Sequence, residues 1–213
     1  MQIRSLLLIP ILLLFLSACG NQKQGRVLKL AHGLDPSHPV HQAMVYMAER
    51  CEEISEGELR IEIYPSGQLG SEQQCVELLQ IGSLAITKVS AAVMESFTED
   101  FKVLGLPYVV RSKEHSFKVL DGEIGDELLL STEPFWIRGL CFYDAGSRSF
   151  YTIDTPINHP DDLKGLKIRV MKSMTAMEMV KAQGGSPTPI SWGELYTALQ
   201  SGVVDGAENN PPS

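Results

Sequence analysis

Arg169 is the residue of this sequence with the clearest potential for binding chemistry. In Leu166–Val170, apolar residues alternate with Lys167 and Arg169, which predicts a strand with two different faces. Spacing alone would place both basic residues on a solvated face. Arg169 also stands at the carboxyl end of this strand, just before a helix that Ser173 can cap. A planar guanidinium in that place can hold a carboxylate through two hydrogen bonds, and Arg148 can supply a second positive contact.

The histidines allow a different interpretation, in which the protein is a metal-dependent hydrolase. His32, His38 and His41 lie close together in the sequence, but H-E-x-x-H and comparable zinc-hydrolase patterns are absent. The sequence also has no G-x-S-x-G, G-x-G-x-x-G or Walker motif. We therefore expect no metal ion, no cofactor and no catalytic residue, and we keep the hydrolase as the alternative class.

The composition is that of an acidic globular protein. The 213 residues carry a net charge of −8, and 44% of them are hydrophobic. This length suits one large domain or two small ones. Nucleic-acid binding needs clustered Lys and Arg, and long basic runs are absent. We expect no nucleic-acid partner.

The N-terminus resembles a bacterial lipoprotein signal peptide, which we assign to residues 1–18. Arg4 precedes an apolar run, Leu6–Leu16, that is too short to span a bilayer. A retained membrane anchor is the alternative. The next residues, Leu16-Ser17-Ala18-Cys19, resemble a lipobox, in which the cysteine receives lipid. We expect export to the periplasm or cell surface, a lipid anchor at Cys19 and a polar tether at 19–26.

Three cysteines remain in the mature chain: Cys51, Cys75 and Cys141. Their number is odd, so at least one thiol stays free or pairs with another chain. Cys51 and Cys75 fall on apolar helical faces, which indicates buried side chains, while a single disulfide stays possible in an oxidising compartment.

Strands and helices alternate along the mature chain, which predicts an α/β fold with a mostly parallel sheet. The expected strands are 27–33, 59–63, 84–89, 136–143, 149–153 and 166–170. The first expected helix has Ser37 as its cap, Pro39 in its first turn and an apolar stripe from Val40 to Ile54, and it ends at Gly57. The other expected helices are 72–81, 113–120, 124–130, 174–183 and 192–200.

A sequence pattern that occurs twice in the chain predicts two similar α/β lobes. Ser71 and Gln74 form a capping-box pattern, and Ser191 and Glu194 repeat it. A Leu-Gln-x-Gly string follows each serine at the same offset, and a short apolar strand comes after it. We divide the chain into a first lobe, 27–146, and a second lobe, 147–213. Crevices between domains are preferred ligand sites, so we expect the ligand there.

Several strings together resemble the DctP-type solute-binding proteins of tripartite ATP-independent periplasmic (TRAP) transporters. In chain order they are Ile63-Tyr64-Pro65-Ser66-Gly67-Gln68-Leu69-Gly70, Leu106-Pro107-Tyr108, Leu163-Lys164-Gly165-Leu166-Lys167-Ile168-Arg169-Val170, Gly185-Ser186-Pro187-Thr188-Pro189 and residues 194–209, ELYTALQSGVVDGAEN. The set spans essentially the whole mature chain in the family's order.

The resemblance implies a periplasmic-binding-protein-like fold whose two α/β lobes close over an organic acid and deliver it to a membrane permease. The family's carboxylate-binding arginine falls on Arg169, its binding asparagine on Asn209, and a second ligand arginine on Arg148. Local strings are similar to a subgroup that binds sugar acids such as hexuronates. The hydroxyls of a hexuronate would find partners in His32, Lys88 and Asn209. A C4-dicarboxylate or another carboxylate is the alternative ligand.

Two departures from the family accompany the resemblance. Some sialic-acid-binding members carry a glutamate where this sequence has Ser90, near Lys88, so a sialic acid is not the expected ligand. Family members also continue well beyond this length, which implies that the sequence is C-terminally incomplete.

Overall fold

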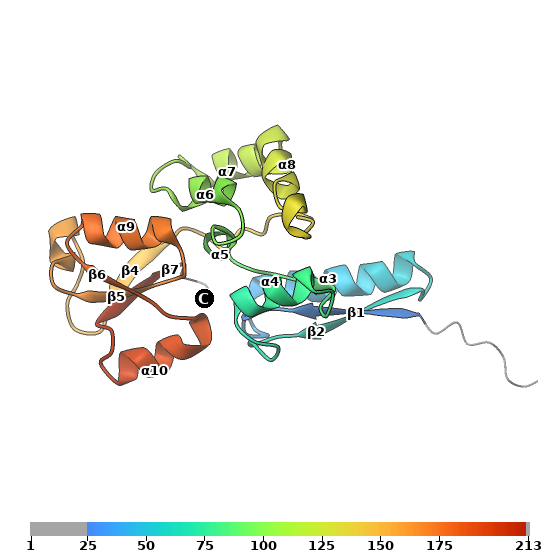
Figure 1. Ribbon diagram of the computed structural model, residues 1–213, viewed down its shortest axis with the longest axis horizontal. Coiled ribbons are helices and arrows are strands. Elements are labelled where there is room, and N and C mark those ends of the chain that lie inside the picture. Colours follow the sequence, from blue (N-terminus) through green and yellow to red (C-terminus); the bar gives the residue numbers. More distant parts are fainter. Residues whose placement is uncertain (1–24, 212–213) are drawn as a thin grey trace, which may run out of the picture.

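The chain forms two separate β-sheets with helices packed against them (Figure 1). The computed structural model describes residues 25–211. The predicted signal peptide and lipidated Cys19 lie outside the described residues, as does nearly all of the tether. The strands of the first sheet precede residue 146 and those of the second follow residue 147. The predicted α/β fold with mostly parallel strands is confirmed, because four of the five strand pairs are parallel.

The first sheet has three parallel strands in the order β2-β1-β3. Its elements are β1 (Arg26–Ala31), α3 (Pro39–Ile54), β2 (Leu59–Tyr64), α4 (Glu72–Gln80) and β3 (Ile86–Thr87). Leu30 of β1 packs against Val40 and Met44 in one buried cluster, as the apolar stripe of the helix predicted. Burying such side chains contributes roughly 1.5–3 kcal/mol each.

The N-cap of helix α3 lies one residue later than predicted, at His38 instead of Ser37. Ser37 is not the cap, because its backbone N–H and its hydroxyl both donate to Asp35 Oδ1, at 2.8 and 2.7 Å. His38 takes that place, and its Nδ1 accepts from the N–H of Val40 at 3.1 Å. Pro39 occupies the first turn, as predicted.

The second sheet has four strands in the order β4-β7-β5-β6, with β4 antiparallel to β7. Its elements are β4 (Ser149–Thr152), β5 (Lys167–Val170), α9 (Met174–Ala182), β6 (Ser186–Pro189), α10 (Leu195–Gln200) and β7 (Gly206–Asn209), with short 3₁₀ turns η3 (Pro160–Leu163) and η4 (Trp192–Glu194). Helices α9 and α10 lie on opposite sides of the sheet (Figure 1). Both faces of the inner strand β5 are therefore covered, which is typical of parallel sheets.

The repeated helix–glycine–strand unit is present in both lobes, although only one of its two caps forms. Ser71 and Gln74 make the expected capping box at α4. Ser191 precedes the 3₁₀ turn η4 and makes no side-chain capping bond, so the second box is wrong. Gly82 and Gly202 follow the helices with φ of +73° and +69°, a left-handed conformation that glycine adopts without strain.

Short helices connect the two sheets. They are α5 (Ala91–Met94), η1 (Glu99–Phe101), α6 (Lys102–Gly105), α7 (Lys113–Leu120), α8 (Glu123–Leu130) and η2 (Glu133–Phe135). The predicted strand at 136–143 is wrong, because this segment pairs with no strand among the described residues. Trp136 has φ of +64°, and the Gly139 N–H donates to the hydroxyl of Thr132 rather than to a ladder. Between residues 25 and 211, no helix is long and apolar enough to cross a membrane.

A buried carboxylate joins this connecting segment to the second lobe. Glu95, just after α5, is 8% exposed, and its Oε2 accepts from the Ser173 hydroxyl at 2.9 Å and from the Thr175 N–H at 3.2 Å. Ser173 caps α9, as predicted. The negative charge of Glu95 therefore lies at the positive end of the α9 dipole. Ser173, the cap of this helix, follows Arg169 by four residues.

Candidate functional site

Arg169 is buried in the second lobe rather than solvated. Only 1% of its surface is exposed, whereas Lys167 on the same strand is exposed. Its Nε donates to the carbonyl oxygen of Ile190 at 2.8 Å, and its guanidinium lies 5.9 Å from the centre of the Trp192 ring. The other guanidinium end, Nη1, is buried and has no hydrogen-bond partner among the described residues.

The charges around Arg169 are unevenly balanced. Burial lowers the pKa of its guanidinium, while the nearby carboxylate of Glu208 raises it and Arg148 lowers it. An arginine stays protonated in proteins, so the group remains a cation with an unused donor. Such a buried cation is most stable when an anion meets it.

Arg148 already has a carboxylate partner. Its Nε contacts Glu208 Oε2, and its Nη2 donates to Glu208 Oε1 and to the Glu208 carbonyl oxygen, both at 2.9 Å. The Glu208 side chain is 4% exposed, while that of Arg148 is 36% exposed. The geometry therefore makes Arg148 first of all the counter-ion of a buried glutamate.

Asn209 follows Glu208 on β7 and is 8% exposed. It faces Ser149 of β4 in the strand register, while Ala207 two residues earlier faces Arg169 of β5. Arg169 and Asn209 thus lie on neighbouring strands of one sheet, and Arg148 directly precedes β4, the third strand of this group.

His32 is a buried histidine of the first lobe with both ring nitrogens engaged. Its Nδ1 accepts from the N–H of Leu34 at 3.1 Å, and its Nε2 lies 3.0 Å from Nδ1 of His41. Burial lowers the pKa of His32 to about 4, with further contributions from His41, Lys88 and His38. At neutral pH His32 is therefore uncharged.

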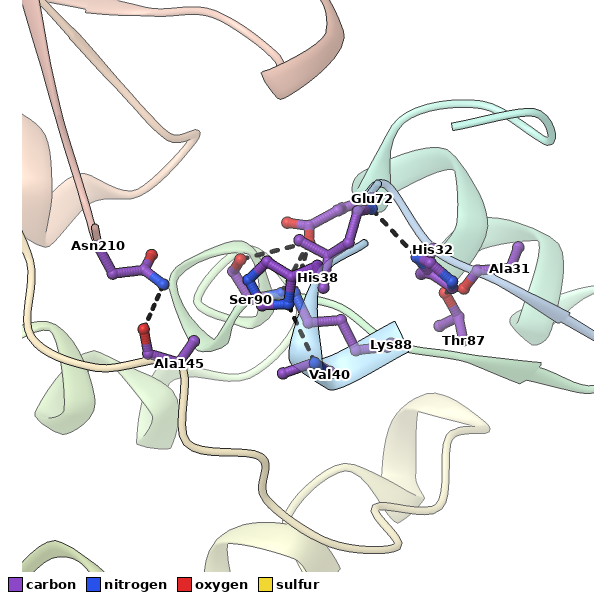
Figure 2. Close-up of polar contacts among 11 residues, drawn as sticks. Ala31, His32, His38, Val40, Glu72, Thr87, Lys88, Ser90, Ala145 and Asn210 are labelled. Atoms are coloured by element: carbon purple, nitrogen blue, oxygen red, sulfur yellow. Dashed lines mark hydrogen bonds and ion pairs between the residues drawn. The ribbon is translucent and has the colours of Figure 1, made fainter. Parts of the chain in front are cut away.

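Lys88 lies just after β3 and pairs with Glu72 at the start of α4. The Lys88 Nζ is 3.5 Å from Glu72 Oε1, and both side chains are about 15% exposed. The same oxygen accepts from the backbone N–H and the hydroxyl of Ser90, at 3.2 and 3.3 Å (Figure 2). Lys88 and Glu72 are thus held next to each other.

A cleft of about 670 Å³ is lined by residues of both lobes. Glu72 and Gly33 line it from the first lobe, and Arg169 and Trp192 line it from the second. Its volume suits a small organic molecule. Arg169 is the only one of the five predicted ligand residues among its lining residues. A shallower groove of about 520 Å³ between α3 and β2 contains none of the five.

In the part of the chain that the structure describes, the histidines belong to no cluster of metal-ligating side chains. Within residues 25–211, no group of three or more His, Cys, Asp or Glu side chains is placed to hold a metal ion. The cysteines in this part of the chain are free: Cys75 is buried, Cys51 is partly buried and Cys141 is exposed.

Three residues near the site are not predicted from the sequence: Glu72, Glu208 and Trp192. Glu72 could have been found, because it follows the predicted cap Ser71 at a helix start beside the expected cleft. Glu208 stands next to Asn209 in the string that carries the resemblance. The sequence carries no comparable signal for the stacking of Trp192 on Arg169, which depends on how β6 and β5 lie side by side.

Comparison with known proteins reveals one family. Residues 30–213 match the family described as bacterial extracellular solute-binding protein, family 7 (DctP). An uncharacterized protein of Salmonella typhimurium, YiiZ, is 41% identical over 185 residues, which cover 86% of this chain and 56% of that protein. The chain thus spans little more than half the length of this relative.

Solved structures are similar over the same region. A TRAP periplasmic solute-binding protein from Anaerococcus prevotii, with bound D-glucuronate, has a TM-score of 0.84 and 41% sequence identity, covering 86% of this chain and 60% of that one. Another from Sulfurospirillum deleyianum, with bound succinate, has a TM-score of 0.83 and 32% identity, covering 86% of this chain and 59% of that one.

Proposed function

The chain belongs to the bacterial extracellular solute-binding proteins of family 7, and on this premise we propose that it is the substrate-binding subunit of a TRAP transporter. In this role it captures a small organic acid outside the cytoplasmic membrane and delivers it to a membrane permease. The family binds solutes and does not consist of enzymes, so the metal-dependent hydrolase is set aside.

The unpartnered Nη1 of Arg169 carries this proposal. A buried guanidinium with one end bonded to Ile190 and the other end free is suited to receive a carboxylate. Trp192 stacks against the cation and lines the same cleft, so the ligand carboxylate would lie on the second lobe. Asn209 and Arg148 complete the proposed site, the latter through its pair with Glu208.

The proposed ligand is a sugar acid, with a C4-dicarboxylate as the alternative. A relative that is 41% identical holds D-glucuronate and one that is 32% identical holds succinate, so the family accommodates both kinds of acid. We place the first lobe at residues 27–146 and the second at 147–213. His32 and Lys88 of the first lobe are proposed to face the hydroxyls of the ligand. A lipid anchor at Cys19 also belongs to the proposal, and fatty-acid labelling of the protein in cells tests it.

Calorimetric titration with D-glucuronate, D-galacturonate, succinate and malate tests the function. We expect one of these acids to bind, and we expect Arg169→Met to weaken it by about 2–5 kcal/mol, or roughly 30-fold to several thousand-fold. Arg138→Met is the matched control, because Arg138 is exposed and pairs with Glu133 on the surface. If Arg169→Met binds the acid as tightly as the unmodified protein does, the proposed site is wrong.

A further inference from the structure

Glu95 joins two helices that belong to different parts of the fold. Helix α5, which Glu95 follows, is one of the connecting helices and lies between the two sheets in Figure 1, whereas α9 packs on strands of the second sheet. Glu95 Oε2 accepts from the Ser173 hydroxyl and the Thr175 N–H of the α9 N-terminus. The Ser96 hydroxyl donates to the Lys172 carbonyl oxygen at 3.4 Å across the same junction. Polar contacts thus hold α5 against the start of α9.

This junction is buried and closely packed. Glu95 is 8% exposed and Ser173 is 2% exposed. Helix α6 approaches both sides of the contact: a Cβ atom added at Gly105 would lie 2.7 Å from Glu95 Oε1 and 3.1 Å from the Cβ of Thr175. Even a methyl group at Gly105 would therefore displace one of the two.

One oxygen of the Glu95 carboxylate has no partner. Within residues 25–211, Oε1 is a buried side-chain atom without a hydrogen bond. A buried carboxylate that is only half satisfied costs free energy of folding. The stability of the fold therefore does not explain why a glutamate stands here. Residues that break a rule of stability are expected where function requires them.

The same junction borders the cleft. Val93, two residues before Glu95, lines the cleft, and so does Met171, two residues before Ser173. Glu95 and Ser173 are not among the lining residues themselves. The hydrogen bonds of Glu95 therefore join the wall that α5 contributes to the wall that follows Arg169.

We propose that Glu95 is a positioning residue of the ligand site, which holds the segment after Arg169 at a fixed distance from α5 without touching the ligand. A cleft whose walls are already in place loses less conformational freedom when a ligand binds. Without Glu95 the binding-competent arrangement is populated only part of the time, and the apparent affinity falls by that fraction. This inference rests on the proposed function, because it assumes that Arg169 receives the ligand carboxylate.

Two variants of Glu95 separate its hydrogen bonds from its volume. Glu95→Leu removes the acceptor and keeps most of the buried volume. Glu95→Gln keeps an oxygen that can accept from both donors. Ser112→Ala is the matched control, because exposed Ser112 also accepts at a helix N-terminus, from the N–H of His115 at 3.1 Å, and does not line the cleft. If Glu95→Leu does not fold, Gly105→Ala crowds the same junction from α6.

Calorimetric titration with D-glucuronate, D-galacturonate and succinate gives the first readout. We expect Glu95→Leu to bind about tenfold more weakly, by the same factor for every acid that the unmodified protein binds. The equal factor follows because Glu95 acts through the geometry of the cleft. Glu95→Gln should stay within about twofold of the unmodified protein, and Ser112→Ala should bind unchanged.

Hydrogen exchange of the Thr175 amide gives the second readout. Thr175 lies in the first turn of α9, where an N–H has no partner within the helix, so its protection depends on Glu95. We expect this amide to exchange about tenfold faster in Glu95→Leu than in the unmodified protein or in Ser112→Ala.

Four results would overturn the positioning role and leave the solute-binding function standing. They are unchanged affinity in Glu95→Leu (or in Gly105→Ala, where Glu95→Leu does not fold), unchanged exchange of the Thr175 amide, a loss confined to one acid, and an equal loss in Ser112→Ala. A loss for one acid alone indicates a direct contact, and an equal loss in the control indicates a general effect of stability. Glu95→Gln that binds as weakly as Glu95→Leu would also overturn the role of the two hydrogen bonds. Failure of the unmodified protein to bind any of the acids would overturn both proposals.

Discussion

The pair Arg148–Glu208 allows the clearest separation of a structural charge from a ligand-binding one. Arg148→Met removes the guanidinium and leaves the Glu208 carboxylate 4% exposed without its cation. Breaking a fully buried pair costs about 3–5 kcal/mol. The Arg148 side chain is 36% exposed, and solvent screening reduces the loss, so we expect about 2 kcal/mol. At roughly 2–4 °C per kcal/mol, the melting temperature should fall by about 4–8 °C.

The double variant Arg148→Met/Glu208→Gln supplies the control. Removing both charges takes away the buried unpaired carboxylate, so the double variant should be more stable than the sum of the single changes predicts, by about 1–2 kcal/mol. Thermal and urea unfolding without ligand measure this coupling. Strict additivity, or an Arg148→Met protein that melts like the unmodified one, would refute the reasoning and free Arg148 for a direct ligand contact.

Two further predictions concern a helix cap and a buried histidine. Ser71→Ala should lower the free energy of unfolding by about 1 kcal/mol, because it removes the capping box of α4. Ser191→Ala should leave the free energy of unfolding nearly unchanged, because Ser191 makes no capping bond. Urea unfolding of both variants checks this, and equal losses would contradict it. The pKa of His32 is about 4 in the folded protein, against an ordinary value of 6.5. Between these pH values the unfolded chain binds more protons than the folded one. The free energy of unfolding should therefore fall as the pH drops through this window, by up to about 3 kcal/mol at pH 4. Melting curves from pH 7 to 4 should show a smaller decline for His32→Gln than for the unmodified protein, and parallel declines would exclude His32 as the source.

The regular elements could be predicted because their signals are local. The apolar stripe of α3 and the capping box of α4 each lie within a few turns of sequence, and the structure confirms both. The apolar residues of segment 136–143 also predict a regular element, a strand, and yet this segment forms none. A strand needs a neighbour with free backbone groups, and here the Gly139 N–H bonds to Thr132 instead. Pairing is a property of the fold, which the pattern of one segment does not contain.

The site divides along the same line. Arg169 could be identified from its place before a capped helix, but its burial could not, because alternation along β5 predicts an exposed basic face. Helices on both sides of the second sheet reverse that expectation. The pairing of Arg148 with Glu208 joins residues 60 positions apart. Contacts over such distances depend on strand order, and the order β4-β7-β5-β6 is not encoded in any short string.

The stacking of Trp192 on Arg169 gives the protein an intrinsic optical signal. The sequence contains two tryptophans, and the other, Trp136, is 84% exposed on the connecting helices. Indole emission depends on nearby charge and water, so neutralisation of the guanidinium 5.9 Å from the ring should change the fluorescence of Trp192. Replacing Trp136 by phenylalanine would leave a single emitter at the cleft. Occupancy of the cleft could then be followed in real time, without labels, on the time scale of a stopped-flow experiment.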